Sequence, residues 1–407
     1  MAGPLQGVRV LDLSRVLAGP WCTQILSDLG AEVIKIERPG MGDDTRQWGP
    51  PWLKDENGEP TEEAAYFLSA NRGKHSLTVD ISKPEGCVLI HELAAKSDIF
   101  IENFKIGDLD KKGLAYEQIR KTKPDIIYCS ITGFGQDGPM AGHAGYDYLI
   151  QAMGGLMSIT GVADGEPGAG PQRVGVAIGD LTTGMYSVIA IQAALHHRTK
   201  TGQGQHIDMS LLDTQVSWLA NQASNYFISG ECPKRTGAQH PNLTPYQPFQ
   251  TKDGYVIIAI GNDGQFQRFS KEADYPELAN DTRYMTNPDR NKHRASLITE
   301  MEKLLLTRTS QRWIDSLQKV AVPCGPINTL EEVFEDPQVK HRGMKIELDH
   351  ASGTKVSGVA NPIKFSETAI EYIKAAPTLG EDNLHVLQNV LGKSHAEVKM
   401  LTEKKII

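Results

Sequence analysis

Asp180 is the residue whose type and setting most clearly suit a chemical role. It follows a run of small and apolar residues, 175–179, and precedes a helical pattern that begins at Leu181. This position predicts a helix N-cap, because an Asp side chain there accepts hydrogen bonds from free backbone N–H groups. The positive end of the helix dipole would also keep the carboxylate ionised, which suits a nucleophile. The two roles are compatible, and the residues alone leave both open.

The first half of the chain alternates short β-branched runs with helical periods, and these elements must position Asp180. Such an alternation predicts a mainly parallel, doubly wound sheet. The first strand-to-helix turn, residues 14–20, lacks the G-x-G-x-x-G pattern that brings a pyrophosphate against a helix N-terminus. We therefore expect an α/β, Rossmann-like fold that binds no dinucleotide. The expected strands are 8–13, 31–37, 98–102, 125–131 and 207–209, and the expected helices are 22–29, 85–96 and 181–197.

Length and composition narrow the class of protein. A chain of 407 residues exceeds what one hydrophobic core usually supports, so we expect two domains, with a Pro- and Gly-rich boundary or functional loop at 229–248. The net charge of −8 argues against general nucleic-acid binding. The five cysteines form no C-x-x-C pair, so neither a metal site nor a disulfide framework is indicated. No apolar stretch of about 18 residues predicts a membrane span, and we expect a cytoplasmic location.

Blocks of sequence in a fixed order along nearly the whole chain resemble the family III CoA-transferases. The blocks are residues 5–14, 18–20, 28–39, 71–74, 102–104, 130–135, 145–147, 179–180, 201–205 and 379–381. In that family two protomers interlock like rings in a chain, and each has a large Rossmann-like domain and a smaller one. The resemblance implies an interlocked homodimer here. It also implies a large CoA-binding domain over 1–200 completed by 330–407, a small α+β domain over 225–325, and linkers near 201–224 and 326–345.

The resemblance also implies a reaction in which Asp180 is the covalent nucleophile. Its carboxylate would attack an acyl-CoA thioester to give a mixed anhydride, and the released CoA thiolate would then form an aspartyl-CoA thioester. An incoming acid would reverse these steps. Coenzyme A is then a substrate, and no separate cofactor or metal is expected. Water must be excluded, because both intermediates would otherwise hydrolyse.

Matching positions imply which residues bind CoA in a chain that is acidic overall. Lys111 stands where the family often has arginine, which puts bidentate phosphate binding there in doubt. Leu17 stands where formyl-CoA transferases typically carry glutamine, which argues against formyl or oxalyl groups. Each of these Lys and Arg side chains has the alternative of being a solvated surface charge, and Phe104 the alternative of core packing. The implied CoA-binding residues are Val16, Leu17, Ala18, Arg38, Asn103, Phe104, Lys105 and Lys111, with Arg72 and Lys74 as additional candidates.

Three segments, 42–51, 224–227 and 245–247, look most like the branch of the family that uses glutarate and succinyl-CoA. Arg46 could therefore meet the distal carboxylate of a dicarboxylic acid, or it could only pin its own loop through Asp43 or Asp44. A glycine-rich segment resembles the small-domain loop that closes over the active site, although an interdomain connection is the alternative. The loop residues singled out are Gly237, His240 and Asn242.

Two other functions compete with CoA transfer. The α-methylacyl-CoA racemases resemble the same N-terminal blocks but use a histidine and an aspartate as acid and base. Their histidine would fall at Tyr146 here, and tyrosine, with an ordinary pKa near 10, is a poor base at neutral pH. His143 would need a different backbone path to replace it. A CoA-binding scaffold without activity is the non-enzymatic alternative, and the retention of Asp180 argues against it.

Overall fold

The structure is a computed structural model that describes residues 3–407. The chain divides into two compact units, and each is described by itself. The first comprises the chain up to Leu156 together with Val174–Ser224 and Gln338–Ile407, and the second comprises Met157–Arg173 and Asn225–Pro337. Residues 157–173 thus belong to the second unit, although they lie within the range expected for the large domain.

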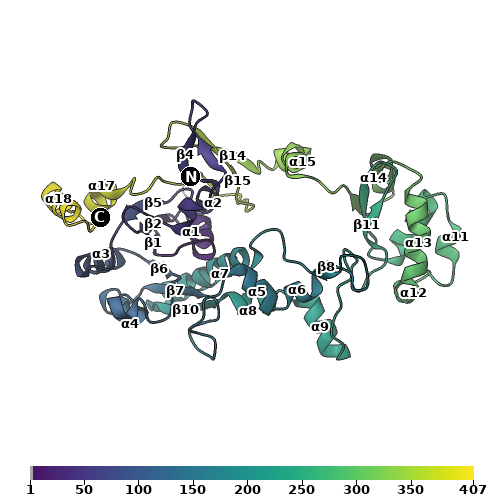
Figure 1. Cartoon of the computed structure of the whole chain (residues 1–407), viewed down its shortest axis with the longest axis horizontal. Coiled ribbons are helices and arrows are strands. Elements are labelled where there is room, and N and C mark those ends of the chain that lie inside the picture. The colour runs from purple at the N-terminus through teal and green to yellow at the C-terminus, as the bar shows by residue number, and fades with distance from the viewer. Residues whose placement is uncertain (1–2) are drawn as a thin grey trace. The chain divides into compact units, whose positions relative to one another are not determined.

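A six-stranded parallel sheet forms the centre of the first unit (Figure 1). Its strand order is β10-β7-β6-β1-β2-β5. Along the chain, β2 and β5 are added on one side of β1, and β6, β7 and β10 are then added on the other side. This is the arrangement of doubly wound Rossmann-like sheets, and the expected α/β fold with a parallel sheet is confirmed. The strands are β1 (Arg9–Asp12), β2 (Glu32–Glu37), β5 (His75–Thr78), β6 (Ile99–Glu102), β7 (Ile127–Thr132) and β10 (Gln205–Ser210).

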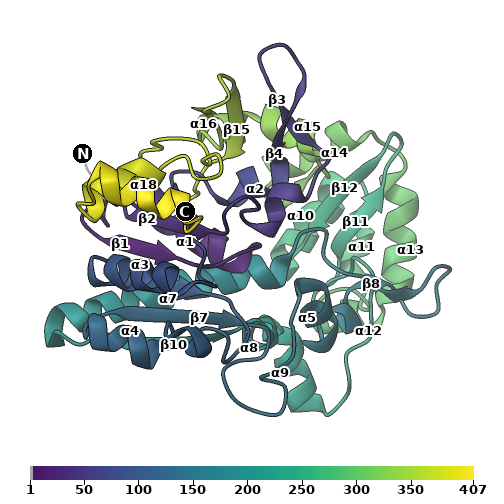
Figure 2. The same cartoon turned by 60° about the vertical axis from the view of Figure 1, so that its left-hand side comes forward.

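Helices cover both faces of this sheet because its strands carry apolar residues on both sides. Consecutive residues of β1 separate into the two cores: Val10 packs with α1, α5, α7 and α8, whereas Leu11 packs with α3, α4 and α18. Figure 2 shows β1 and β7 with helices above and below. The helices of this unit are α1 (Ala18–Asp28), α2 (Ala65–Ala70), α3 (Pro84–Ala95), α4 (Tyr116–Thr122), α5 (Asp147–Met153), α7 (Ile178–Thr201), α8 (Leu211–Ser217), α17 (Asn383–His385) and α18 (His395–Glu403).

Short elements extend the first unit, and some helices cross the boundary between the units. Two antiparallel hairpins are β3 (Trp52–Lys54) with β4 (Pro60–Ala64), and β14 (Lys345–Asp349) with β15 (Lys355–Val359). Two 3₁₀ turns are η1 (Asp44–Gln47) and η2 (Asp110–Lys112), and η3 (Val386–Val390) is a π-helical turn. The helices α6 (Leu156–Ile159), α9 (Ala220–Ser229) and α16 (Pro337–His341) contain residues of both units.

The second unit is an α+β structure with its own core. A three-stranded antiparallel sheet, in the order β11-β12-β13, packs against helices around the fully buried Trp313. Its elements are β8 (Gly161–Val162), β9 (Gly170–Pro171), β11 (Tyr246–Gln250), β12 (Tyr255–Ala259), β13 (Cys324–Gly325), α10 (Asp263–Glu272), α11 (Glu277–Asn280), α12 (Asn287–Lys292), α13 (Arg294–Leu305), α14 (Ser310–Lys319) and α15 (Leu330–Glu335).

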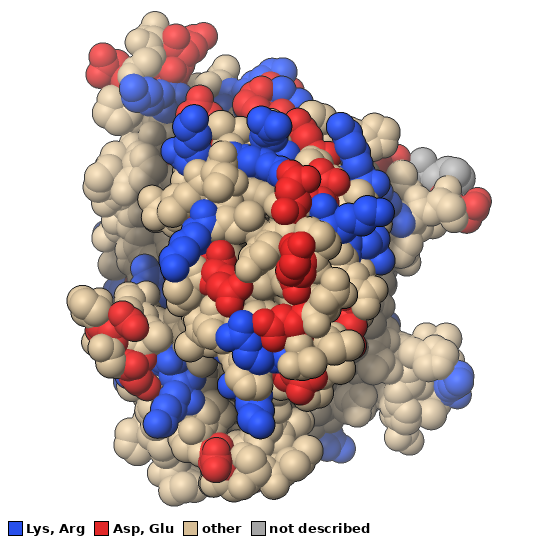
Figure 3. Space-filling view, turned by 90° about the vertical axis from the view of Figure 1, so that its right-hand side faces the viewer, with Lys and Arg blue, Asp and Glu red and all other residues tan. Residues whose placement is uncertain are grey.

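The surface agrees with the modest net charge. On the face drawn in Figure 3, Lys and Arg side chains are interspersed with Asp and Glu. Within residues 3–407, no helix combines the length and the apolar character that a membrane span requires.

Candidate active site

The candidate site lies where the strand order of the large sheet reverses. Strands β1 and β6 are neighbours, but the chain continues from β1 to β2 on one side and from β6 to β7 on the other. In doubly wound sheets, ligands bind at the carboxyl ends of two such strands. The loop after β1 and the loop after β6 both line a cavity of about 190 Å³, and Asp180 lines it from α7. The fold therefore brings the candidate nucleophile to the position where a doubly wound sheet binds its ligand.

Asp180 is not the N-cap of its helix, and this prediction was wrong. Helix α7 begins at Ile178 with Ala177 as its N-cap, so Asp180 is the third helical residue. The capping role belongs to Asp147, whose Oδ1 accepts hydrogen bonds from the backbone N–H of Gly179 at 2.7 Å and of Asp180 at 3.4 Å. A Cβ at Gly179 would lie 3.0 Å from this Oδ1, which explains the glycine. Because Asp147 satisfies the helix end, the Asp180 carboxylate is left to the cavity.

The Asp180 carboxylate is also less readily ionised than the helix dipole alone would predict. Burial raises its pKa, and the nearby charge of Asp147 raises it further, to about 7. These two effects outweigh the helix N-terminus, whose contribution is typically below about 1 kcal/mol at an exposed site. At neutral pH the group is therefore divided between its protonated and ionised forms.

A buried ion pair holds the loop that carries Val16. Lys35 Nζ lies 2.9 Å from Asp43 Oδ2, and both side chains are fully buried. Lys35 also donates to the backbone oxygen of Ser14 at 2.9 Å, and both carboxylate oxygens of Asp43 lie 3.3 Å from the backbone N–H of Val16. Val16 has a φ of 70°, which a β-branched residue rarely adopts. The ion pair thus fixes a strained backbone in the wall of the cavity, directly before Leu17 and Ala18.

The loop after β6 is tied to the loop after β1 through Asn103. The side-chain amide of Asn103 accepts a hydrogen bond from the backbone N–H of Arg15 at 2.9 Å and donates one to its carbonyl oxygen at 2.7 Å. Phe104 is partly buried against the core, and the Arg15 guanidinium lies 5.1 Å from its ring centre. Lys105 is exposed on the cavity wall. Six of the eight residues expected to bind CoA therefore line one cavity with Asp180.

A second, larger cavity of about 500 Å³ adjoins the first and shares Arg15, Asp44 and Phe104 with it. Arg38, expected to bind CoA, lines this second cavity, whereas Lys111 lines neither; its amine is exposed, 3.5 Å from Asp108. The sequence analysis missed several cations of this cavity, which come from separate parts of the chain. They are Arg15, Lys83, Lys112 and Lys405.

Arg46 occupies a structural position outside both cavities. Its guanidinium donates to both carboxylate oxygens of Glu37 at 2.8 Å, to Glu63 at 3.3 Å and to the Pro377 carbonyl oxygen at 3.0 Å. It also stacks 3.6 Å from the ring centre of Phe67. Arg46 therefore pins its loop, as the alternative predicted, but through Glu37 and not through Asp43 or Asp44.

The two additional cationic candidates, Arg72 and Lys74, are likewise engaged within the protein. Arg72 pairs with Asp28 at 2.6 Å. Lys74 is fully buried, and its amine donates to Asn71 Oδ1 at 2.8 Å and to the Pro20 carbonyl oxygen at 2.9 Å. Neither side chain lines either of the two cavities.

The loop residues Gly237, His240 and Asn242 belong to the second unit, where the loop is well anchored. Gly237 has a φ of 63°, which suits a glycine. The backbone N–H of Asn242 donates to His240 Nδ1 at 3.0 Å, and the Asn242 side chain pairs with Asn225 at 3.1 Å. The proposed closure of this loop over the reaction centre stays a prediction.

Two aromatic residues and a histidine complete the surroundings of Asp180. Tyr146 and His143 line its cavity, and His143 Nδ1 lies 3.2 Å from the Met140 carbonyl oxygen. Burial, with the charges of Asp180 and Asp147, raises the pKa of Tyr66 to about 12, so its hydroxyl stays protonated. Sequence reasoning missed Tyr66 and the role of Asp147, although the block 145–147 pointed to the latter.

Comparison with known proteins assigns the chain to a family. Residues 5–383 match the profile of CoA-transferase family III. The succinate–glutarate CoA-transferase of Agrobacterium fabrum is 49% identical over 94% of this chain and 95% of its own length, and the human succinyl-CoA:glutarate CoA-transferase is 45% identical over 95% and 86%. The crystal structure of a CAIB/BAIF family protein from Brucella suis superposes with a TM-score of 0.84 at 49% identity, covering 96% of this chain and all of that one. The chain therefore belongs to the family III CoA-transferases.

Proposed function

We propose that this enzyme transfers CoA from succinyl-CoA to a dicarboxylic acid such as glutarate, through covalent intermediates on Asp180. The observation that carries the proposal is a carboxylate in a small cavity that adjoins a larger cationic one. Asp147 accepts the hydrogen bonds from the start of α7, so the Asp180 carboxylate is left facing the cavity. The names of the relatives supply the two acids, because each describes a transferase that uses succinate or succinyl-CoA with glutarate.

The two adjoining cavities suit the two ends of CoA. The larger one, of about 500 Å³, is lined by six lysine and arginine side chains and is of the size that ligand pockets usually have. Its cations would meet the phosphates, since charge-assisted hydrogen bonds to phosphate are among the stronger polar contacts. The shared residues Arg15 and Phe104 mark the passage to Asp180, along which the pantetheine arm would run. Leu17 and Ala18, both buried, would border the thioester.

The reaction proceeds by exchange of acyl groups on Asp180. Its carboxylate attacks the thioester carbonyl of succinyl-CoA, the C–S bond breaks, and CoA leaves as a thiolate from a succinyl–aspartyl anhydride. The thiolate attacks the aspartyl carbonyl and releases succinate, leaving an aspartyl-CoA thioester. The carboxylate of glutarate attacks this thioester, and the CoA thiolate that leaves attacks the glutaryl carbonyl of the new anhydride. Glutaryl-CoA forms, and Asp180 is regenerated with no net hydrolysis.

The distal carboxylate of the acids requires a cation near Asp180. Because Arg46 is committed to Glu37 and Glu63, we assign this role to the cations that line the Asp180 cavity, Arg15 and Lys105. The Arg15 guanidinium lies 3.5 Å from the Asp44 carboxylate, so this pair is loose. The side chains of Arg15 and Lys105 are both exposed. Either can turn toward a bound diacid.

We further propose that two copies form the interlocked homodimer that the resemblance implies. Apolar side chains are exposed on α5, α7 and α8, and a monomer would gain by covering them. In such a dimer, the loop with Gly237, His240 and Asn242 would close over a reaction centre and exclude water. The exposed apolar residues of these helices are Tyr148, Leu149, Met153, Met185, Tyr186, Ile189 and Val216.

Substitution of Asp180 tests the covalent mechanism. Asp180→Asn should lower kcat by roughly 10³-fold or more, because the amide cannot form the anhydride. Asp213→Asn is a matched control, since Asp213 is the exposed third residue of helix α8 and lines neither cavity. After incubation with succinyl-CoA, hydroxylamine followed by peptide mass spectrometry should modify Asp180 in the wild type. Near-normal turnover of Asp180→Asn would refute the mechanism.

The pH dependence of the reaction tests the environment of Asp180. Only the ionised carboxylate attacks, so kcat/KM should rise with pH through about 7, the raised pKa of Asp180. Asp147→Asn removes one of the two causes of this shift while keeping an oxygen that caps α7, so the rising limb should move to lower pH. Asp213→Asn should leave the limb in place. An unchanged limb in Asp147→Asn would mean that the Asp147 charge does not act on the nucleophile.

Arg38 and Lys111 form a matched pair for testing the CoA cavity. Loss of a charge-assisted phosphate contact costs about 1.5 to 3 kcal/mol, so Arg38→Ala should weaken CoA binding roughly 10- to 150-fold. Lys111→Ala should leave the dissociation constant unchanged, because Lys111 lies outside both cavities. Isothermal titration calorimetry with CoA measures both. Equal constants for Arg38→Ala and the wild type would remove Arg38 from the site.

Steady-state kinetics across acceptors test the proposed acids. With succinyl-CoA as donor, kcat/KM for glutarate and similar C4 to C6 diacids should exceed that for oxalate, carnitine and a branched monoacid, because only a diacid of this length reaches both Asp180 and a cation. If a monoacid exceeded every diacid, the dicarboxylate proposal would fail, while CoA transfer itself would stand.

A further inference from the structure

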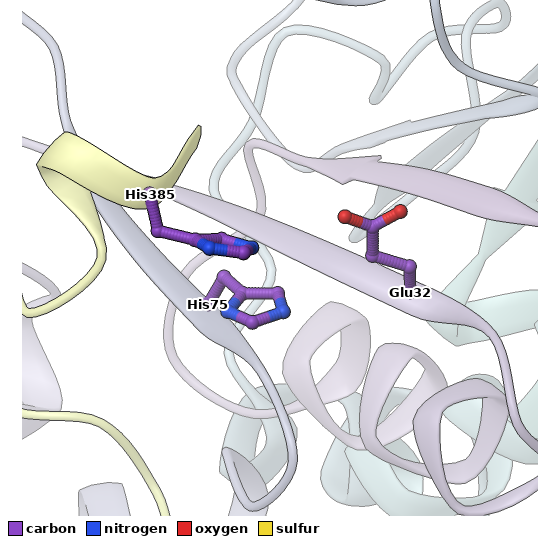
Figure 4. Close-up of side chains that lie close together, drawn as sticks. All are labelled: Glu32, His75 and His385. Carbon is purple, nitrogen blue, oxygen red and sulfur yellow. The ribbon is translucent and has the colours of Figure 1, made fainter. Parts of the chain in front are cut away.

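Three potential metal ligands meet at the edge of the sheet opposite the candidate active site. Glu32 begins β2, His75 begins the neighbouring strand β5, and His385 ends α17 in the C-terminal segment. One ligand atom from each lies within 4.8 Å of the others, and Figure 4 shows the two imidazole rings stacked with the Glu32 side chain to one side of them. Because the strands are parallel, their N-terminal ends lie away from the carboxyl ends that carry the Asp180 cavity. We propose that these residues bind a zinc ion that fastens the C-terminal segment to the sheet.

The hydrogen bonds of His75 leave the correct nitrogen for a metal. His75 Nδ1 lies 2.8 Å from Asp382 Oδ1. The Asp382 carboxylate also accepts from Lys374 at 2.9 Å and from the backbone N–H of Ser76 at 2.9 Å. Because Nδ1 faces this carboxylate, Nε2 is the ring nitrogen of His75 that is left to face a metal. A carboxylate behind an imidazole is the arrangement usual for metal-binding histidines.

His385 is arranged in a similar way. Its Nδ1 lies 2.9 Å from the side-chain amide of Asn389, one helical turn later. The Asn389 atom that faces the ring is Nδ2, which donates to Nδ1. Rotation of the amide by half a turn places its oxygen there, so that Nδ1–H donates to Asn389 and Nε2 is left for a metal. His385 stacks on His75 with ring centres 4.9 Å apart, and its side chain is exposed, so it has room to turn and direct its Nε2 toward the same point.

Glu32 supplies the negative charge. One of its oxygens accepts a hydrogen bond from Arg9 Nε at 2.8 Å, which holds the carboxylate in place and leaves its second oxygen for a metal. Two imidazoles and one carboxylate form a donor set that suits zinc, with a fourth position left for water. Ligand atoms around tetrahedral zinc lie about 3.4 Å apart, so from separations within 4.8 Å the three side chains must close by at most about 1.4 Å. None of the three is fully buried, so each has room to do so.

The bound ion would join parts of the chain that are distant in sequence. The C-terminal segment already docks on β5 through the backbone N–H of Asp382, which donates to the Ser76 carbonyl oxygen at 3.0 Å, and through Asn383, which pairs with Thr78. A metal ligated from β2, β5 and α17 adds a cross-link to this docking. An ion that binds only the folded chain stabilises it by an amount that rises with the logarithm of the free ion concentration once this exceeds the dissociation constant.

Zinc binding by the untagged full-length protein tests the site. After equilibrium dialysis against zinc chloride, mass spectrometry should find one zinc per chain, and His385→Ala should weaken binding at least about 10-fold. His341→Ala, which removes an exposed histidine of α16, should bind zinc as the wild type does. Substitution with cobalt should give the absorption bands of a tetrahedral site in the wild type and not in His385→Ala.

Two further measurements keep the inference falsifiable if one variant is unstable. Glu32→Gln retains an oxygen for Arg9 and should also weaken zinc binding, while its zinc-free transferase activity stays normal and shows that the fold is intact. Zinc should raise the midpoint of thermal unfolding in the wild type and in His341→Ala, but not in His385→Ala. Absence of saturable zinc binding, or equal affinity in the wild type, His385→Ala and Glu32→Gln, would overturn the proposal.

Discussion

The buried ion pair between Lys35 and Asp43 is the interaction on which the rest of the site depends. Isolated charges in a protein interior are strongly unfavourable unless they are paired and hydrogen-bonded. Burial acts to lower the pKa of Lys35, but Asp43, Asp12 and Glu37 together raise it above its ordinary value, so the amine remains charged. That charge holds the Ser14 carbonyl oxygen, and its partner Asp43 holds the N–H of Val16. These contacts therefore tie strand β2 to the loop that lines the cavity.

At Lys74, a second buried lysine, burial outweighs the nearby carboxylates, which is the opposite of the balance at Lys35. Burial lowers the pKa of Lys74 to about 8, although Asp12 partly offsets the effect. Asp12 is shared between the two lysines and also accepts hydrogen bonds from Ser14 and Thr23 at 2.5 and 2.6 Å. On the other side of the cavity, Asp147 takes over the helix end and so frees Asp180. Beside Asp180, a second carboxylate thus performs the structural task, and the reacting carboxylate is left to face the cavity.

The fold was largely predictable because its strands are apolar and regularly spaced, whereas particular site residues were not. The parallel sheet follows from the alternating pattern, but β5, with the polar sequence His75-Ser76-Leu77-Thr78, gives no strand signal. Asp180 was found, yet its N-cap role was wrong, because the helix starts at Ile178, three residues earlier than expected, and Asp147 of α5 accepts hydrogen bonds from its first N–H groups. Lys83, Lys112 and Lys405 were missed because only the folded chain brings them together. The cluster of Glu32, His75 and His385 was missed for the same reason, because these residues are far apart in the sequence and meet only in the folded chain.

The division of the chain also constrains the order in which the protein can fold. Residues 225–337 form most of a separate unit with its own core, inserted between two parts of the first unit. The N-terminal part can pair its strands, but the edge strand β5 and the cationic cavity are completed only by residues beyond 338, about 300 positions away from their partners. Closing contacts over such separations is slow. Until then, the open edge of β5 offers unpaired backbone groups to other chains, so this edge is where misassembly would begin.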